Sequence, residues 1–226
     1  VAHGARCAGE LRQSLAPGRF DPARAENAFV LSMADATAAK IVPGLMDILE
    51  HEAPGVTLRI LPLTTRDPRE LLEAGGVDLA IGHIPGVLAE LGAVHLQEHN
   101  PLFLHQRLYD SEYVVVMRRG HPLAAQPISL DAYCDARHLL VSFSGRPFGF
   151  VDAALATLSR RRRVVLTVNQ FFTAGQVVAT TDLLTVLPRH FVDATGMAHR
   201  LALQELPLAV PAVHIDALWR RQAEHH

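Results

Sequence analysis

The chain has 226 residues, 49% of them hydrophobic, with a formal net charge of −2 at pH 7. This length can bury either one large α/β core or two lobes of about 100 residues each, and we favour two lobes. The near-neutral charge argues against direct binding of nucleic acid, and no apolar run approaches the ~18 residues that span a bilayer.

The first part of the chain predicts a short helix, a strand and a long helix. Apolar residues at helical spacing predict a helix over 3–15, which a Pro-Gly pair would end. The run 28–32 predicts a strand, and a helix follows from about residue 36 to residue 52. Pro43 interrupts this helix, but the apolar stripe continues beyond it, so we expect a kink and not an end.

The stretch 71–83 is the most informative part of the sequence. A glycine pair supplies the left-handed cap that stops its helix, and an apolar run suited to a parallel strand follows at 77–81. His83 comes just after the carboxyl end of that strand, which is where open α/β sheets hold ligands. With a strand at 56–61 and a helix at 67–74, this half of the chain forms a β-α-β-α-β unit.

The second half of the chain repeats this alternation. After an irregular or extended connection at 93–109, a β-rich run at 112–117 opens a second series. The elements that follow are a strand at 139–141, a helix at 150–161, a strand at 164–168, a helix at 173–180 and a strand at 183–187. A strand-like piece at 201–213 and an amphipathic helix at 215–223 would return to the first lobe. The sequence therefore predicts two lobes, two crossings and a cleft.

Motifs for catalysis are missing from the sequence. The segment Ser142–Arg146 is the nearest approach to a nucleophile elbow and lacks both flanking glycines, and there is no phosphate-binding glycine loop. His95, His99 and His105 have no acidic or cysteine partner at the spacing of a metal site. The run Arg160–Arg163 predicts a solvated helix end, with a phosphate-binding patch as the alternative. We predict no catalytic residue, no metal and no cofactor.

Polar and aromatic residues follow the predicted strands or start the predicted helices in both halves. They are Asp35, Thr37, Thr64, Thr65, His83, Phe148, Gln170 and Phe171. Helix N-termini carry free amides and a positive dipole, so a small carboxylate or phenol could be held there without a dedicated Lys or Arg. Phe148 and Phe171 would supply apolar contact for a ring or an alkyl body. Each residue also has a plain structural interpretation as a cap, a turn or a core side chain.

Six short motifs occur in one order along nearly the whole chain. They are Phe20-Asp21-Pro22, Ile41-Val42-Pro43, His51-Glu52-Ala53-Pro54-Gly55-Val56, Gly76-Val77-Asp78-Leu79-Ala80-Ile81-Gly82, Gly120-His121-Pro122-Leu123 and Thr181-Asp182-Leu183-Leu184. Each is weak singly, but together they resemble the effector-binding domain of LysR-type transcriptional regulators. The resemblance implies an α/β fold of two Rossmann-like lobes, similar to type 2 periplasmic binding proteins. It also implies a small-molecule inducer between the lobes, and a preceding winged helix-turn-helix that binds promoter DNA and is not in this chain.

The resemblance also assigns segments and site residues by position. Residues 1–19 would end a linker helix, 20–111 and 201–226 would form lobe I, and 112–200 would form lobe II. The inducer would contact Ala36, Thr37, Thr65 and His83 in lobe I, and Phe148, Gln170 and Phe171 in lobe II. Such proteins are cytoplasmic homodimers or homotetramers that assemble through the helix at 36–52 and its neighbouring strand, without a membrane partner. The spacing around Gly149 and Asn169 is most similar to members that sense aromatic compounds.

Two other classes of protein share this fold. A solute-binding protein of a transport system is the main alternative, and its full-length gene would open with an export signal. An enzyme on the same scaffold would need a coherent acid-base set, which the sequence lacks. We therefore expect a LysR-type effector-binding domain that senses a small organic acid, with an aromatic acid favoured.

Overall fold

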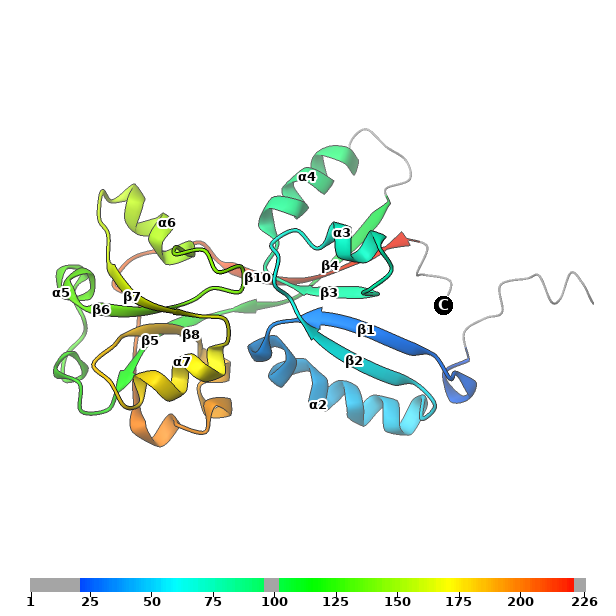
Figure 1. The fold of residues 1–226 in the computed structure, drawn as a ribbon, viewed down its shortest axis with the longest axis horizontal. Helices are drawn as coiled ribbons and strands as arrows, with labels where there is room; N and C mark the ends of the chain where they lie inside the picture. Colours follow the sequence, from blue (N-terminus) through cyan, green and yellow to red (C-terminus); the bar gives the residue numbers. More distant parts are fainter. Residues whose placement is uncertain (1–20, 96–101, 222–226) are drawn as a thin grey trace, which may run out of the picture.

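Two α/β lobes make up the computed structural model, which describes residues 21–95 and 102–221 (Figure 1). Lobe I contains η1 (Pro22–Arg24), β1 (Ala28–Met33), α2 (Asp35–Glu52), β2 (Thr57–Pro62), α3 (Arg69–Glu73), β3 (Leu79–Gly82), α4 (Pro85–His95), β4 (Phe103–Ser111) and β10 (Val213–Arg220). These strands form one sheet in the order β2-β1-β3-β10-β4. The linker helix expected at 1–19 lies outside the described residues.

Lobe II follows the same alternation. It contains β5 (Tyr113–Arg118), η2 (Pro122–Ala124), α5 (Leu130–Asp135), β6 (Arg137–Val141), α6 (Phe150–Thr157), β7 (Arg163–Val168), α7 (Phe171–Val178), β8 (Thr185–Pro188), η3 (Arg189–Phe191), η4 (Asp193–Thr195), η5 (Ala198–Arg200) and β9 (Leu201–Gln204). Its strands form the sheet β8-β5-β9 and the parallel pair β6-β7, joined by a bridge between His138 and Leu184. The predicted two-lobed α/β fold is confirmed.

Side chains on the sheet of lobe I alternate between two hydrophobic cores, as expected for strands covered on both faces. In β1, Leu31 packs in the core under α2, whereas Val30 contacts the core under α3 and α4. In β3, Ile81 and Ala80 divide in the same way. Within the described ranges, no helix has the length and apolar character that a membrane crossing requires.

The central strand of lobe II is β5, an apolar run buried on both faces. Val114, Val115, Val116 and Met117 are each 0% exposed. Val114 and Val116 belong to the core with α7, and Val115 and Met117 belong to the core with α5 and α6. This explains why the sequence of β5 shows no polar alternation.

The chain crosses between the lobes twice, from β4 into β5 and from β9 into β10. Arg118 of β5 pairs with Leu201 of β9, and Val115 pairs with Gln204, so β9 belongs to the sheet of lobe II. The pairing therefore places the return to lobe I after Gln204, later than residue 201, where the sequence put it.

Two stretches differ from the predicted secondary structure. The stretch 93–109, expected to be irregular or extended, is extended in β4 as expected, but it begins with the helical end of α4. The stretch 215–223, expected to be a helix, is largely occupied by β10. β10 lies between β3 and β4, and its neighbouring residues Ala217 and Leu218 are buried on opposite faces of the sheet. Because both faces are apolar, the sequence lacks the alternation of polar and apolar residues that would have indicated a strand. Pro43 lies inside α2, which continues beyond it as expected.

The arginine run at 160–163 is not a solvated helix end. α6 ends at Thr157, and Arg163 already belongs to β7. The side chain of Arg162 is only 2% exposed and pairs with Asp152, with Nε and Oδ1 2.8 Å apart. Asp152 and the Tyr133 hydroxyl accept hydrogen bonds from three nitrogens of the guanidinium, which compensates for its burial.

The buried His138 gives the stability of lobe II a defined pH dependence. Its Nε2 donates to the Tyr133 carbonyl at 2.7 Å, and burial lowers the pKa of the ring to about 4 from its usual value near 6.5. The unfolded chain takes up this proton near pH 6.5, whereas the native state does so only near pH 4. Stability therefore falls as the pH drops through that window.

We predict that, through the titration of His138, the free energy of unfolding falls by about 2 kcal/mol when the pH is lowered from 7 to 4.5. Denaturant titrations of the wild type and His138→Gln, which keeps a donor for the Tyr133 carbonyl, measure the difference. On acidification over this range, the free energy of unfolding of the variant should fall by about 2 kcal/mol less than that of the wild type. Parallel curves for the two proteins would contradict the prediction.

Candidate functional site

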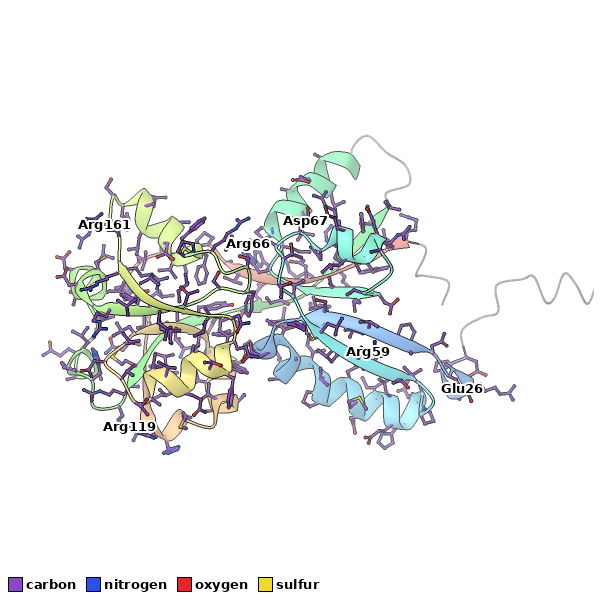
Figure 2. All side chains as sticks on the ribbon, in the orientation of Figure 1. Glu26, Arg59, Arg66, Asp67, Arg119 and Arg161 are labelled. Atoms are coloured by element: carbon purple, nitrogen blue, oxygen red, sulfur yellow. The ribbon has the colours of Figure 1, made fainter. Side chains whose placement is uncertain are left out.

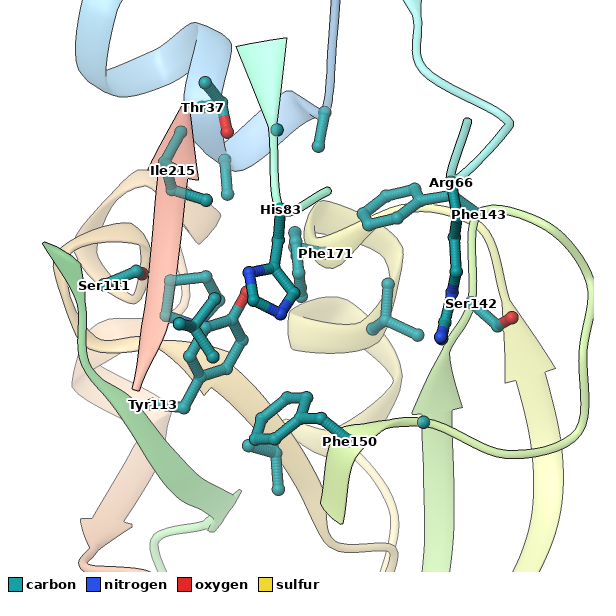
Figure 3. Close-up of a pocket in the computed structure, with 18 of the residues that line it drawn as sticks. Thr37, Arg66, His83, Ser111, Tyr113, Ser142, Phe143, Phe150, Phe171 and Ile215 are labelled. Carbon is teal, nitrogen blue, oxygen red and sulfur yellow. The ribbon is translucent and has the colours of Figure 1, made fainter. Parts of the chain in front are cut away.

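A cavity of about 500 Å³ lies between the two lobes (Figure 3). Lobe I contributes residues that follow the carboxyl ends of β1, β2 and β3, which end at one edge because they run parallel. Lobe II contributes the end of β6 and the starts of α6 and α7. The crossing strands β4, β5 and β10 line the remaining side, so a molecule in the cavity would contact both lobes.

Six of the seven predicted binding residues line this cavity. They are Ala36, Thr37, Thr65, His83, Phe148 and Phe171. Gln170 is the one predicted residue that is not among those lining this cavity. It is the residue just before α7, and its Oε1 accepts a hydrogen bond from Thr173 Oγ1 at 3.2 Å. The hydrogen bond with Thr173 holds the Gln170 side chain along α7, whereas Phe171 lines the cavity.

The hydroxyl of Thr65 is already engaged within the protein. It donates to the Asp67 carbonyl at 3.0 Å and accepts from the Asp67 N–H at 3.1 Å, which forms a tight local turn. The Asp67 carboxylate in turn binds Arg69, with Oδ2 and a guanidinium nitrogen 2.5 Å apart, and the same guanidinium pairs with Glu90 of α4 at 2.8 Å. Thr65 therefore shapes the loop that carries the neighbouring Arg66.

His83 presents a neutral imidazole to the cavity. Its Nδ1 lies 3.0 Å from the carbonyl oxygen of His214, which can only accept, so Nδ1 carries the proton. Burial is the main cause that lowers the pKa of His83, and the charge of Arg66 lowers it further. In the neutral ring, Nε2 is then free to accept a hydrogen bond.

Thr37 and Tyr109 form a polar contact on the lobe I side of the cavity. Thr37 is 4% exposed, and its side chain hydrogen-bonds the Tyr109 hydroxyl. Burial raises the pKa of Tyr109, so the phenol stays protonated. The Tyr109 ring packs edge-on against His190 of lobe II, with centroids 5.8 Å apart.

Aromatic side chains form one wall of the cavity (Figure 3), and of Tyr113, Phe143, Phe150 and Phe171 the sequence had singled out only Phe171. Tyr113 packs edge-on against Phe150 with centroids 5.0 Å apart, and Phe143 packs against Phe171 at 5.3 Å. Burial raises the pKa of Tyr113 far above its usual value, so its hydroxyl stays neutral. These rings give the cavity flat apolar surfaces.

Other lining residues were also missed from the sequence, including Arg66, Ser111 and Ile215. Arg66 directly follows Thr65, so the signal that found the end of β2 could have found it. Ser111 and Ile215 lie in the crossing strands β4 and β10. A residue within a strand carries no sequence signal that it will face a cleft.

Arg66 and Arg162 supply the positive charges among the lining residues. The charge of Arg162 is compensated by Asp152. In the described ranges, by contrast, no carboxylate pairs with Arg66. Figure 2 shows Arg66 at the cleft, whereas Arg161 and Arg119 lie on the outer surface of lobe II. Arg66 is therefore the available cation for an acidic ligand.

The Asp152–Arg162 pair supports the lobe II wall, because Asp152 also accepts the Gly149 N–H at 2.7 Å, just before Phe150. We predict that Asp152→Ala costs about 3–5 kcal/mol of unfolding free energy, since it leaves a buried guanidinium unpaired. Asp131→Ala is the control, because Asp131 pairs with Arg160 but its side chain is 77% exposed. Thermal unfolding should show a large loss for the first variant alone, and similar losses for both would refute the prediction.

The lining of the cavity mixes polar side chains with aromatic rings. In the part of the chain that the structure covers, no group of three His, Cys, Asp or Glu side chains could hold a metal ion. The polar side chains at the cavity include hydroxyls, the imidazoles of His83 and His190 and the guanidinium groups of Arg66 and Arg162, mixed with aromatic rings. Such a lining suits reversible binding of a small, partly apolar molecule.

Comparison with known proteins identifies the class of this domain. Residues 23–226 match the family model of the LysR substrate binding domain. The chain belongs to this family. The transcriptional activator NahR of Pseudomonas putida is 30% identical over 207 residues, which are 92% of this chain and 64% of NahR. A probable transcriptional regulator from Pseudomonas aeruginosa has a solved structure with a TM-score of 0.78 and 30% identity, covering 99% of this chain and 71% of that one.

A more distant structure shows the same fold. It is the BenM effector binding domain with its effector benzoate, with a TM-score of 0.64 and 15% identity over 87% of this chain and 84% of that one. The LysR family membership makes the chain an effector-binding domain and not an enzyme, and it rules against the transport protein considered as the alternative. The chain spans less than two thirds of the length of NahR.

Proposed function

We propose that this chain is the sensor domain of a LysR-type transcriptional regulator, and that it binds a small aromatic carboxylic acid in the cavity between its lobes. The proposal is carried by the cavity itself, which combines aromatic walls with Arg66, a cation that no carboxylate of residues 21–95 and 102–221 compensates. Membership of the LysR family and the similarity to the activator NahR support the regulatory role.

The charge of Arg66 favours an acidic ligand. A guanidinium offers a planar pair of donors that matches a carboxylate, and a charged hydrogen bond of this kind contributes about 1.5–3 kcal/mol. α2 and α7 also begin at the cavity. The N-terminus of a helix is the positive end of its dipole, which favours a nearby anion. The acid would thus be neutralised without a metal or another cofactor.

The walls favour a ring as the body of the ligand. Phe143, Phe150 and Phe171 present apolar faces or edges, and Tyr113 adds a fourth ring. The cavity volume of about 500 Å³ lies within the ~300–1,000 Å³ of typical small-molecule sites. Benzoate, the effector in the BenM structure, belongs to this chemical class and serves as a probe.

In the whole protein, ligand binding would shift the balance between arrangements of the lobes and so change how the subunits are placed. The net charge of −2 supports a role in which promoter DNA is bound by a segment outside this chain, because phosphate binding draws on clustered Lys and Arg. The protein would act in the cytoplasm, where its promoter DNA lies.

Calorimetric titration with benzoate, benzamide and cyclohexanecarboxylate tests the ligand class. Benzoate should bind most tightly, because benzamide lacks the charge and cyclohexanecarboxylate lacks the flat ring. Arg66→Gln should weaken benzoate binding about 10- to 100-fold and leave benzamide unaffected. Arg161→Gln, an exposed arginine away from the cleft, is the matched control. Failure of all three probes to bind, or equal benzoate affinity in Arg66→Gln, would contradict the proposal.

We also propose that the chain forms a homodimer, which could pair into a homotetramer in the whole protein. α2 and α7 lie on one side of the molecule (Figure 1) and carry the exposed apolar residues Ile48, 51% exposed, and Phe172, 47% exposed. Leu166 of β7 is also 37% exposed. β2 and β7 are edge strands of their sheets and leave backbone groups unpaired. A two-fold axis would set the lobe I part of this side against the lobe II part of the partner.

Sedimentation velocity at micromolar concentration tests the dimer. Ile48→Glu and Leu166→Glu should each shift the chain towards monomer, because each places a charge in the proposed interface. Leu158→Glu is the control, since Leu158 is also 51% exposed but follows α6 on the opposite side of lobe II (Figure 1). A monomeric wild type, or dimers that survive both interface variants, would count against the proposed assembly.

A further inference from the structure

We infer that Asp35 is a positioning residue that holds the two lobes together and keeps Phe171 against the cavity. Asp35 lies in the first turn of α2 in lobe I. Its Oδ2 accepts a hydrogen bond from the backbone N–H of Phe172, in the first turn of α7 in lobe II, at 2.8 Å. This bond joins the lobes where the two helices approach each other (Figure 1).

The bond supplies the cap that α7 does not provide for itself. Gln170, in the position before the helix, bonds to the Thr173 hydroxyl, but its side chain does not cap a backbone amide of the first turn. The first amides of a helix have no partner within it, and a carboxylate is favoured there by both hydrogen bonding and the helix dipole. A residue just before the helix usually fills this role, whereas here it comes from the other lobe.

The first turn of α2 makes two further contacts with lobe II. Ala36 belongs to the hydrophobic core of lobe II, together with Val114 and Phe171. His190 donates from Nε2 to the Ala36 carbonyl at 3.3 Å. Opening the cleft has to break both hydrogen bonds and expose Ala36, so this turn is a point at which the lobes are held together.

The same turn is coupled to the ligand cavity. Ala36 lines it from lobe I, and Phe171, the neighbour of the bonded amide, lines it from lobe II. Asp35 itself is not among the lining residues, and its Oδ2 makes the contact between the lobes. The position of the Phe171 wall therefore depends on Asp35, whatever molecule the cavity binds.

Asp35→Ala tests the inference on the chain without ligand, so the outcome does not depend on the proposed function. Amide exchange in the first turn of α7 should become about tenfold faster, as expected when a helix loses a cap. The distance between the lobes should also broaden. Nitroxide labels at Ala89→Cys on α4 and Arg161→Cys in lobe II report this distance by pulsed EPR. The background is Cys7→Ser and Cys134→Ser, diluted with unlabelled protein to suppress distances between protomers.

Two further variants make the test specific. Asp47→Ala removes the same charge from an exposed part of α2 and should change neither measurement. Adding Gln170→Asp to Asp35→Ala gives α7 a cap from its own lobe. This double variant should restore slow exchange in α7 but not the narrow distance between lobes, because no bond then crosses the cleft.

Two results would overturn the inference. One is unchanged exchange and unchanged distance in Asp35→Ala. The other is recovery of both by Gln170→Asp, which would show that Asp35 only caps α7 and does not hold the lobes. If Asp35→Ala does not fold, Asp35→Asn keeps an acceptor oxygen without the charge and should show a smaller change in the same two measurements. No change in Asp35→Asn would then overturn the inference.

Discussion

The parallel pairing of β1 with β2 and β3 is the constraint on which the site depends. Because the three strands run in the same direction, the residues after their carboxyl ends meet at one edge of the sheet. β10 pairs with β3 and β4 in the antiparallel sense, which lets the chain leave this sheet for lobe II and return to it. The cleft therefore arises where a parallel half-sheet meets the two crossing segments.

Several polar groups around the cavity already have partners within the protein. The hydroxyl of Thr65 bonds to Asp67, the Nδ1 of His83 to His214 and the guanidinium of Arg162 to Asp152. A polar group that loses water without a new partner costs free energy, so these arrangements let an apolar ring enter at little cost. Arg66 differs from them, because within the described ranges no carboxylate compensates its charge.

The sequence predicted the parts of the fold that depend on local patterns. The stretch 71–83 and the apolar β5 gave the alternation, the two lobes and the strand end that carries His83. β10 was taken for a helix, because burial on both faces removes the period that distinguishes a strand. Side chains on the crossing strands, such as Tyr113, were missed, since their place at the cavity is set by how the lobes meet. At the start of α7, Phe171 lines the cavity and the neighbouring Gln170 does not.

The network of Asp67, Arg69 and Glu90 has a consequence for how selectively the cavity can bind. It links the loop after β2 to α4, so the backbone that carries Arg66 is restrained before a ligand arrives. A free loop would forfeit conformational entropy on closing, at roughly 0.5–1.5 kcal/mol for each immobilised side chain. Preorganisation of this kind leaves more of the electrostatic attraction to appear as affinity. It also disfavours ligands whose anionic group lies at a different distance from Arg66, because a restrained loop adapts less to them.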